Sequence, residues 1–219
     1  MKKYYWLALG IATFSTMANA SIIPSLMSVT PSGTSFAWTY TAQLSADQRL
    51  DPGATKNAIC TGGLPCSPAG LNPASGTFFT IYDFSGLTSV VSNPTNWNAF
   101  TTFVGTTPSI QSGVPDSNLV SNISFFYNGP TVPTPGSPKP AAGPTNLGNF
   151  VIGSTFSQQT IGFFTGQATK NTGDATDGTL TQNVGSVPVP AGVPEPASMM
   201  LIGSGLVGLA IVRRRLIRG

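Results

Sequence analysis

Apolar and polar residues alternate along much of the chain, which is the pattern of β-strands with one buried face. In residues 36–44, every second position carries an apolar side chain: Phe36, Trp38, Tyr40, Ala42 and Leu44. Similar runs predict strands at residues 77–84, 99–104, 119–127, 147–155, 158–169 and 179–187, with turn-forming residues between them. We therefore expect an all-β fold, an antiparallel β-sandwich of jelly-roll or immunoglobulin-like type.

The composition argues against the common kinds of catalytic chemistry. Only 8% of the 219 residues are charged, and the chain has no His, one Glu and two Cys. Few groups are left for general acid–base, metal or nucleophilic chemistry. We expect no catalytic residue, no metal site and no cofactor, and we interpret the protein as non-enzymatic.

Positive charge is concentrated at the two ends of the chain. The net charge of +3 includes six terminal cations, whereas residues 21–193 contain six Asp against Arg49, Lys56, Lys139 and Lys170. Four scattered cations form no basic stripe that could neutralise phosphates. The sequence therefore argues against nucleic acid as a partner.

The N-terminal segment has the three parts of a secretory signal peptide. Lys2 and Lys3 precede an apolar run over residues 4–14, and Ala18 and Ala20 form a cleavage site of the A-x-A type. The run is too short to cross the roughly 30 Å hydrocarbon core of a bilayer as an anchor. We expect export through the Sec machinery, with removal of residues 1–20 by signal peptidase.

The C-terminal segment predicts a single transmembrane helix. Residues 197–212 are uncharged and mostly apolar, and Arg213, Arg214 and Arg215 follow directly. A helix of this length spans about 24 Å, and arginine side chains that snorkel to the interface extend its reach. By the positive-inside rule, the arginines stop transfer at the inner membrane, so the preceding domain lies outside it.

A short acidic motif, Pro194, Glu195 and Pro196, stands just before this helix. The triplet, the apolar helix and the terminal arginines resemble, in this order, the PEP-CTERM sorting signal of Gram-negative exosortase substrates. Residues 78–84 and 163–169 are also similar to segments of ectodomains that carry this signal. The resemblance implies recognition of the triplet by an exosortase and a transient inner-membrane anchor. It further implies a final location at the cell surface or in the extracellular matrix, with exopolysaccharide as a candidate partner.

Between the two terminal signals we expect one sandwich domain at residues 21–186 and a linker at residues 187–193, before the sorting signal at residues 194–219. Six prolines in residues 130–144 predict an exposed extended loop within the sandwich. Cys60 and Cys66 predict a small disulfide loop in an oxidising compartment, with a metal or redox pair as the weaker interpretation.

The carboxylates leave an alternative function open. Asp83 lies between aromatic residues, where it has either a buried partner or the role of capping a turn at Ser85 and Gly86. Asp174 and Asp177 lie in a Gly-flanked turn that fits an ordinary hairpin better than a calcium loop. The alternative is a secreted glycan-binding protein or a hydrolase that uses Asp residues.

Overall fold

The computed structural model describes residues 21–52, 76–108, 113–132 and 144–192. These ranges form strands and connecting turns, without a helix. The strands are β1 (Ile22–Ser32), β2 (Ser35–Leu44), β3 (Gln48–Arg49), β4 (Phe78–Ile81), β5 (Leu87–Ser92), β6 (Trp97–Thr102), β7 (Asn122–Tyr127), β8 (Thr145–Ser154), β9 (Gln159–Lys170) and β10 (Leu180–Pro190). The expectation of an all-β fold is confirmed for the described residues.

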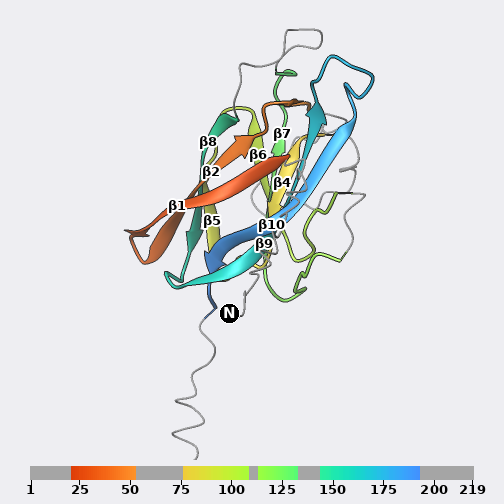
Figure 1. Cartoon of the computed structure of the whole chain (residues 1–219). Coiled ribbons are helices and arrows are strands. Elements are labelled where there is room, and N and C mark those ends of the chain that lie inside the picture. The colour runs from red at the N-terminus through yellow and green to blue at the C-terminus, as the bar shows by residue number, and fades with distance from the viewer. Residues whose placement is uncertain (1–20, 53–75, 109–112, 133–143, 193–219) are drawn as a thin grey trace, which may run out of the picture.

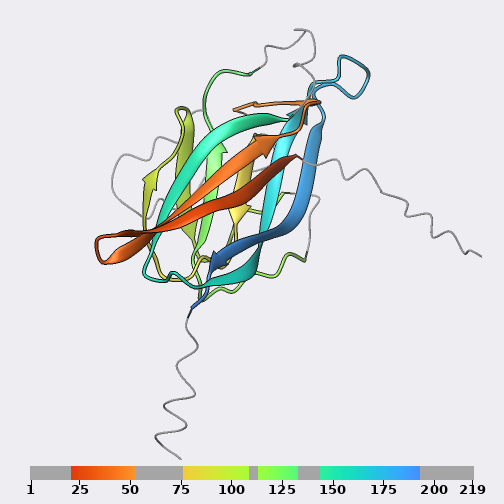
Figure 2. The same cartoon turned by 60° about the vertical axis from the view of Figure 1, so that its left-hand side comes forward.

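The strands form two antiparallel sheets that lie face to face as two layers (Figures 1 and 2). The first sheet has the order β1-β2-β8-β5, and the second has the order β10-β9-β4-β7-β6, with the short β3 paired to β9. Figure 2 shows β1 and β2 running obliquely across the strands of the second sheet. Two layers of this kind bury one core between their inner faces.

The core between the sheets is largely aromatic. The ring of Phe150, on β8, lies 4.9 Å from that of Phe79 on β4 and 4.8 Å from that of Phe125 on β7, both edge-on. Trp38 and Tyr40, which alternate along β2, are fully buried and contact Phe84 edge-on. Such aromatic contacts between layers add to the burial of apolar area, and they fix how the two sheets face each other.

The outer face of the second sheet is buried around β4 and β7, beneath the chain that follows β6, whereas Ile161 and Val184 on β9 and β10 are exposed on this face. The hydroxyl of Thr80 lies 2.7 Å from that of its cross-strand neighbour Ser124, and it donates to the carbonyl oxygen of Thr106 at 2.7 Å. Thr165 is the neighbour of Thr80 on the other side and is fully buried. Hydroxyl groups therefore satisfy the polar backbone of the covering chain.

Besides the two-residue β3, two strands lie where the alternation pattern predicts none. β1 and β5 are the outer strands of the first sheet, and most residues of both are exposed or half-buried. An outer strand buries less of its surface, so its apolar and polar positions alternate weakly. In β1, Pro24 and Pro31 weaken the strand signal further, because proline lacks an amide donor.

The sandwich extends past the boundary expected at residue 186. β10 continues to Pro190, and Val187 and Val189 are each 1% exposed. The linker expected at residues 187–193 is therefore corrected over residues 187–190, which belong to the core. Pro188 and Pro190 account for the error, since prolines indicate a tether in the sequence but are tolerated in an outer strand such as β10.

Several predicted features lie outside the described residues. They are the signal peptide with Ala18 and Ala20, the pair Cys60 and Cys66, residues 133–143 of the Pro-rich loop, the triplet Pro194, Glu195 and Pro196, the helix at residues 197–212, and Arg213, Arg214 and Arg215. Among the residues that the structure does describe, no helix has the length and hydropathy needed to cross a membrane.

Candidate functional site

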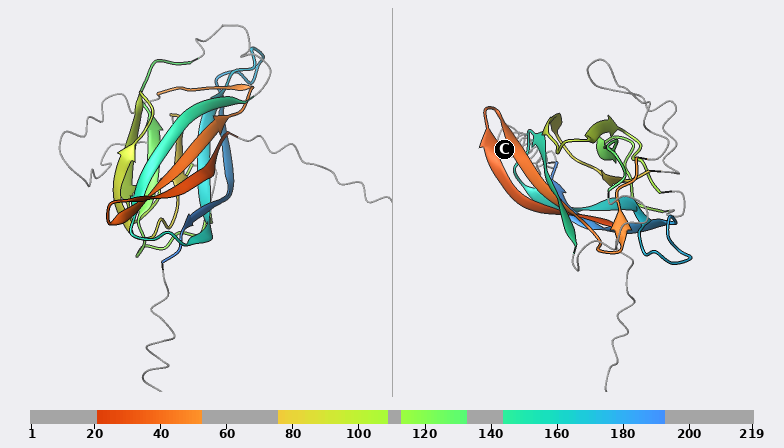
Figure 3. Two further views of the ribbon diagram at one scale, coloured as in Figure 1. Left: turned by 90° about the vertical axis from the view of Figure 1, so that its left-hand side faces the viewer. Right: turned by 90° about the horizontal axis from the view of Figure 1, so that it is seen from above.

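One end of the sandwich leads the chain into its C-terminal segment. Pro190, the last residue of β10, pairs with Gln159, the first residue of β9, and the amide of Ala191 donates to the carbonyl oxygen of Gln158 at 2.8 Å. β7 begins at this end, at Asn122. We call it the exit end; it lies at the bottom of Figure 1 and of the left view in Figure 3.

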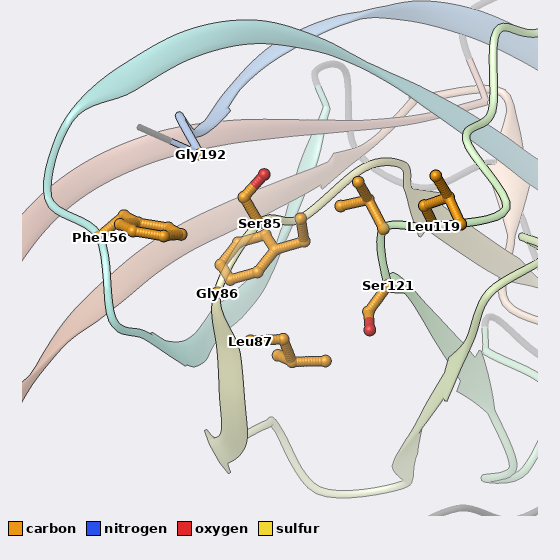
Figure 4. Close-up of a pocket in the computed structure, with 9 residues that line it drawn as sticks. Ser85, Gly86, Leu87, Leu119, Ser121, Phe156 and Gly192 are labelled. Carbon is orange, nitrogen blue, oxygen red and sulfur yellow. The ribbon is translucent and has the colours of Figure 1, made fainter. Parts of the chain in front are cut away.

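A shallow hollow of about 390 Å³ opens at the exit end. Figure 4 shows Phe156 and Gly192 on one side of it and Leu119 and Ser121 on the other. The lining combines apolar side chains with two serines and exposed backbone: Phe84, Ser85, Gly86, Leu87, Leu119, Val120, Ser121, Phe156 and Gly192. Its walls thus come from three separate turns and from the start of the C-terminal segment.

The wall at Phe156 is held by hydrogen bonds from β2 and β8, which are neighbours in the first sheet. The indole nitrogen of Trp38 donates to the carbonyl oxygen of Phe156 at 2.9 Å, and the amide of Phe156 donates to the Ser154 hydroxyl at 3.0 Å. That hydroxyl donates in turn to the carbonyl oxygen of Ser85 at 2.8 Å. The hollow is therefore a fixed feature of the fold, built on groups that are themselves buried.

Gly86 is required by this arrangement. Its φ of +64° lies in the left-handed region, and a Cβ atom there would stand 2.4 Å from the Thr155 hydroxyl oxygen and 2.6 Å from the Phe156 ring. The amide of Thr155 also donates to the carbonyl oxygen of Gly86 at 2.8 Å. A side chain at this position would strain the backbone and displace the wall.

The opposite wall is anchored beneath and exposed above. The amide of Phe84 donates to the carbonyl oxygen of Ser121 at 2.8 Å, and the Phe84 ring is fully buried in the core. Leu119, by contrast, is 83% exposed. A large apolar side chain that stands in solvent at the rim of a hollow is available for contact with another molecule.

Two carboxylates at the exit end are engaged in structural hydrogen bonds. Asp83 has a left-handed φ of 54°; its carboxylate accepts from the amide of Ser117 at 2.9 Å, and its amide donates to the side-chain oxygen of Asn122 at 2.8 Å. The Asn122 side chain donates to Asp116 at 2.8 Å, and Asp116 also accepts from the amide of Gly105 at 2.9 Å. The Asp83 carboxylate therefore binds the loop before β7 instead of the turn at residues 85–86. The sequence did not indicate that Asp116 belongs to the same network, through Asn122.

Tyr82 completes this network as a neutral donor and acceptor. Its hydroxyl lies 2.7 Å from that of Thr107 and 3.1 Å from that of Thr165, and it donates to the carbonyl oxygen of Thr106 at 3.0 Å. Burial raises the pKa of Tyr82 above its ordinary value, and the nearby Asp116 carboxylate adds to the rise. The side chain therefore stays protonated and fastens the covering loop to the sheet.

Three further carboxylates serve local structure at the far end of β9. Asp177 accepts from the Arg49 guanidinium at 3.1 Å, and Asp51 lies 3.9 Å from the same group. Asp174 accepts from the amide and the hydroxyl of Thr176 at 2.8 and 2.7 Å, as in an ordinary turn. Across the part of the chain that the structure describes, no three His, Cys, Asp or Glu residues are grouped to hold a metal ion.

A comparison with known protein families matches residues 192–215 to the PEP-CTERM protein-sorting motif. The chain carries a PEP-CTERM sorting signal. Such a signal implies an exported protein with a C-terminal membrane-anchoring segment, processed by an exosortase. The PEP-CTERM match includes Pro194, Glu195 and Pro196, and it begins at Gly192, which lines the hollow. No curated protein and no solved structure matches the chain.

The sequence pattern identified the PEP-CTERM signal but missed the hollow beside it. Phe84, Leu119 and Phe156 lie far apart along the chain and meet only when both sheets have formed. The adjacent Ser85 and Gly86 indicated a turn, which is correct, but a turn alone does not predict a cavity. Leu119 was placed in the strand predicted at residues 119–127, but β7 begins only at Asn122, and Leu119 is exposed in the loop before it.

Proposed function

We propose that this protein is a non-enzymatic component of the cell surface or extracellular matrix, delivered by an exosortase. The observation that carries the proposal is the position of the PEP-CTERM signal, which begins two residues after β10 ends. The apolar helix holds the exported precursor in the inner membrane, and the exosortase cuts at the triplet and releases the β-sandwich. Glu195 serves as the charged handle, since two prolines keep the triplet out of a helix.

The surroundings of the carboxylates support a non-enzymatic role. The chain has no His, and Asp51, Asp83, Asp116, Asp174 and Asp177 each accept a structural hydrogen bond or an ion pair. A glycosidase needs two carboxyl groups that are free to face a sugar across a cleft. These side chains are engaged with their own backbone and with Arg49, which favours a structural function.

An association with exopolysaccharide follows from the chemistry of the domain. A low-charge protein rich in Ser and Thr hydroxyls offers neutral donors and acceptors, which suit neutral sugar hydroxyls better than ionic ligands. We regard the secreted sandwich as a matrix protein that contacts glycans without cutting them. Retention of the processed protein on the host's own polysaccharide in affinity electrophoresis, without loss of polymer length, tests this part.

The sorting step is tested by substitution in the triplet. Replacing Glu195 by Ala should leave the precursor in the inner membrane at uncut mass, because the exosortase loses the charged handle. Mass spectrometry of the membrane and extracellular fractions provides the measurement, and deletion of the exosortase should give the same result. A processed C-terminus in the variant, identical to that of the wild type, would contradict the proposal.

A further inference from the structure

We propose that the hollow at the exit end, with Leu119 at its rim, is a docking surface for the exosortase. The enzyme then recognises the folded domain together with the tail, and processing is fastest once the sandwich has formed. This inference rests on the proposed function and adds a second contact to it. The hollow lies on the described domain, outside the Pro-Glu-Pro triplet.

The chain between the hollow and the triplet is short. Gly192 lines the hollow, and Pro194 begins the triplet only two residues later. A fully extended chain covers at most about 3.6 Å per residue, so the triplet lies within about 7 Å of Gly192 and about 14 Å of Pro190. A peptide-cutting enzyme that holds the triplet in its cleft must therefore rest against the exit end of the sandwich.

Several apolar side chains are exposed at the exit end. Leu119 is 83% exposed, Ile161 near the start of β9 is 68% exposed, and Phe103 and Val104, which follow β6, are 60% and 71% exposed. The register places all of them at the end where β10 finishes, because Thr102 pairs with the first residue of β7. Exposed apolar side chains gathered beside a hollow are typical of protein–protein contact surfaces.

The distribution of charged residues favours a protein partner for the exit end over a lipid surface. Within the described residues the cations are Arg49 and Lys170, and both lie where β3 pairs with the last residues of β9, about 35 Å from the exit end. The exit end carries Asp83 and Asp116 instead. Peripheral proteins that bind anionic membranes place cations toward the lipid, and no cation of the described residues lies at the exit end.

The walls of the hollow are held in place by the fold before a partner binds. Trp38 holds Phe156 from one sheet, and the hydroxyl of Ser154 ties the neighbouring strand to Ser85. A surface whose walls are fixed loses little conformational entropy on binding, so more of the contact energy appears as affinity.

The test measures how fast the full-length precursor is processed in cells that contain the exosortase. Leu119→Asp introduces a charge at the rim of the hollow, where the side chain is already in solvent. Met27→Asp is the matched control, since Met27 is 63% exposed on β1. In pulse–chase labelling, we expect L119D to be processed about tenfold more slowly than the wild type, and M27D at the wild-type rate. Resistance of the secreted forms to protease verifies folding.

A spacer variant tests the geometry independently of any change in the fold. Six Gly and Ser residues inserted after Gly192 increase the largest possible separation of the hollow and the triplet by about 20 Å. We expect slower processing of this variant, and a smaller additional effect of L119D in it than in the wild type, because the two contacts are no longer held together.

The outcomes separate this inference from the proposed function. If the wild type is processed and L119D is processed equally fast, or if M27D is slowed as much as L119D, docking at the hollow is overturned while sorting by the exosortase stands. If the wild type itself is not processed, the proposed function fails. Binding of the processed wild type, but not of L119D, to vesicles of phosphatidylethanolamine and phosphatidylglycerol would assign the surface to lipid and overturn the proposal.

Discussion

Gly86 offers a direct test of how the hollow is built. Its backbone is left-handed, and the space where a Cβ atom would stand is taken by the Thr155 hydroxyl and the Phe156 ring, at 2.4 and 2.6 Å. Gly33, in the turn between β1 and β2, has almost the same φ, +61° against +64°, and a Cβ atom there would meet nothing within 4 Å. The two positions therefore share the conformational cost of an alanine and differ in the steric cost.

The expected loss in free energy of unfolding follows from the conformational and steric costs. Gly33→Ala should lower the free energy of unfolding by about 1 kcal/mol, the cost of holding an L-residue in the left-handed region. Gly86→Ala adds overpacking of about 1–3 kcal/mol, because Phe156 is tied to Trp38 and cannot move without breaking a part-buried hydrogen bond. We expect a total loss of about 2–4 kcal/mol for G86A.

Urea unfolding followed by tryptophan fluorescence provides the assay. Trp38 and Trp97 are buried, at 0% and 4% exposure, so their emission should report loss of the core. G86A should be less stable than G33A by at least about 1 kcal/mol, or by about 2–4 °C in melting temperature. Equal stabilities of the two variants would refute the reasoning, because only the contact with Thr155 and Phe156 distinguishes them.

Two further predictions concern ionisable groups. Arg49→Met should lower the free energy of unfolding by about 2–3 kcal/mol, because it leaves the Asp177 carboxylate without the Arg49 side chain, which is 9% exposed. The 30% exposure of the Asp177 side chain limits this loss. Urea unfolding measures the change, and a smaller loss for Arg49→Met than for Arg49→Lys would contradict the ion-pair account. Burial raises the pKa of Tyr40, whose hydroxyl donates to Pro188 at 2.8 Å. The unfolded chain releases this proton near pH 10 while the folded chain retains it, so stability should hold below pH 10 and fall above it. Tyr40→Phe should show a shallower fall in alkaline unfolding curves, and an unchanged slope would count against a buried, neutral Tyr40.

Much of the core was predictable because it follows local alternation. β2 spans Ser35–Leu44, close to the run predicted at residues 36–44, and Trp38 and Tyr40 face the core as expected. The prediction failed where the signal is not local. β1 and β5 bury little of their surface, and β10 ends in alternating valine and proline, which indicates a tether unless the pairing with β9 is known.

At the candidate site, too, the contiguous motif could be predicted from the sequence and the long-range contacts could not. The Pro-Glu-Pro triplet is a contiguous motif and was identified from the sequence, and a comparison with known families matches it. Asp83 was singled out correctly as an engaged carboxylate, but its partner Ser117 lies in a loop 34 residues away. The hollow depends on contacts between residues far apart in the sequence, such as the hydrogen bond from Trp38 to Phe156, which spans 118 residues. No local pattern encodes a contact of this range.

The prolines of the outer strands bear on how the secreted domain behaves among many copies of itself. Pro24 and Pro31 lie in β1, and Pro188 and Pro190 lie in β10, so each sheet has one outer strand that lacks amide donors at two positions. A strand from a second molecule finds an interrupted ladder there and gains little by adding to it. The sandwich thereby resists fibril formation through these edges without carrying the surface charge that other proteins use for solubility.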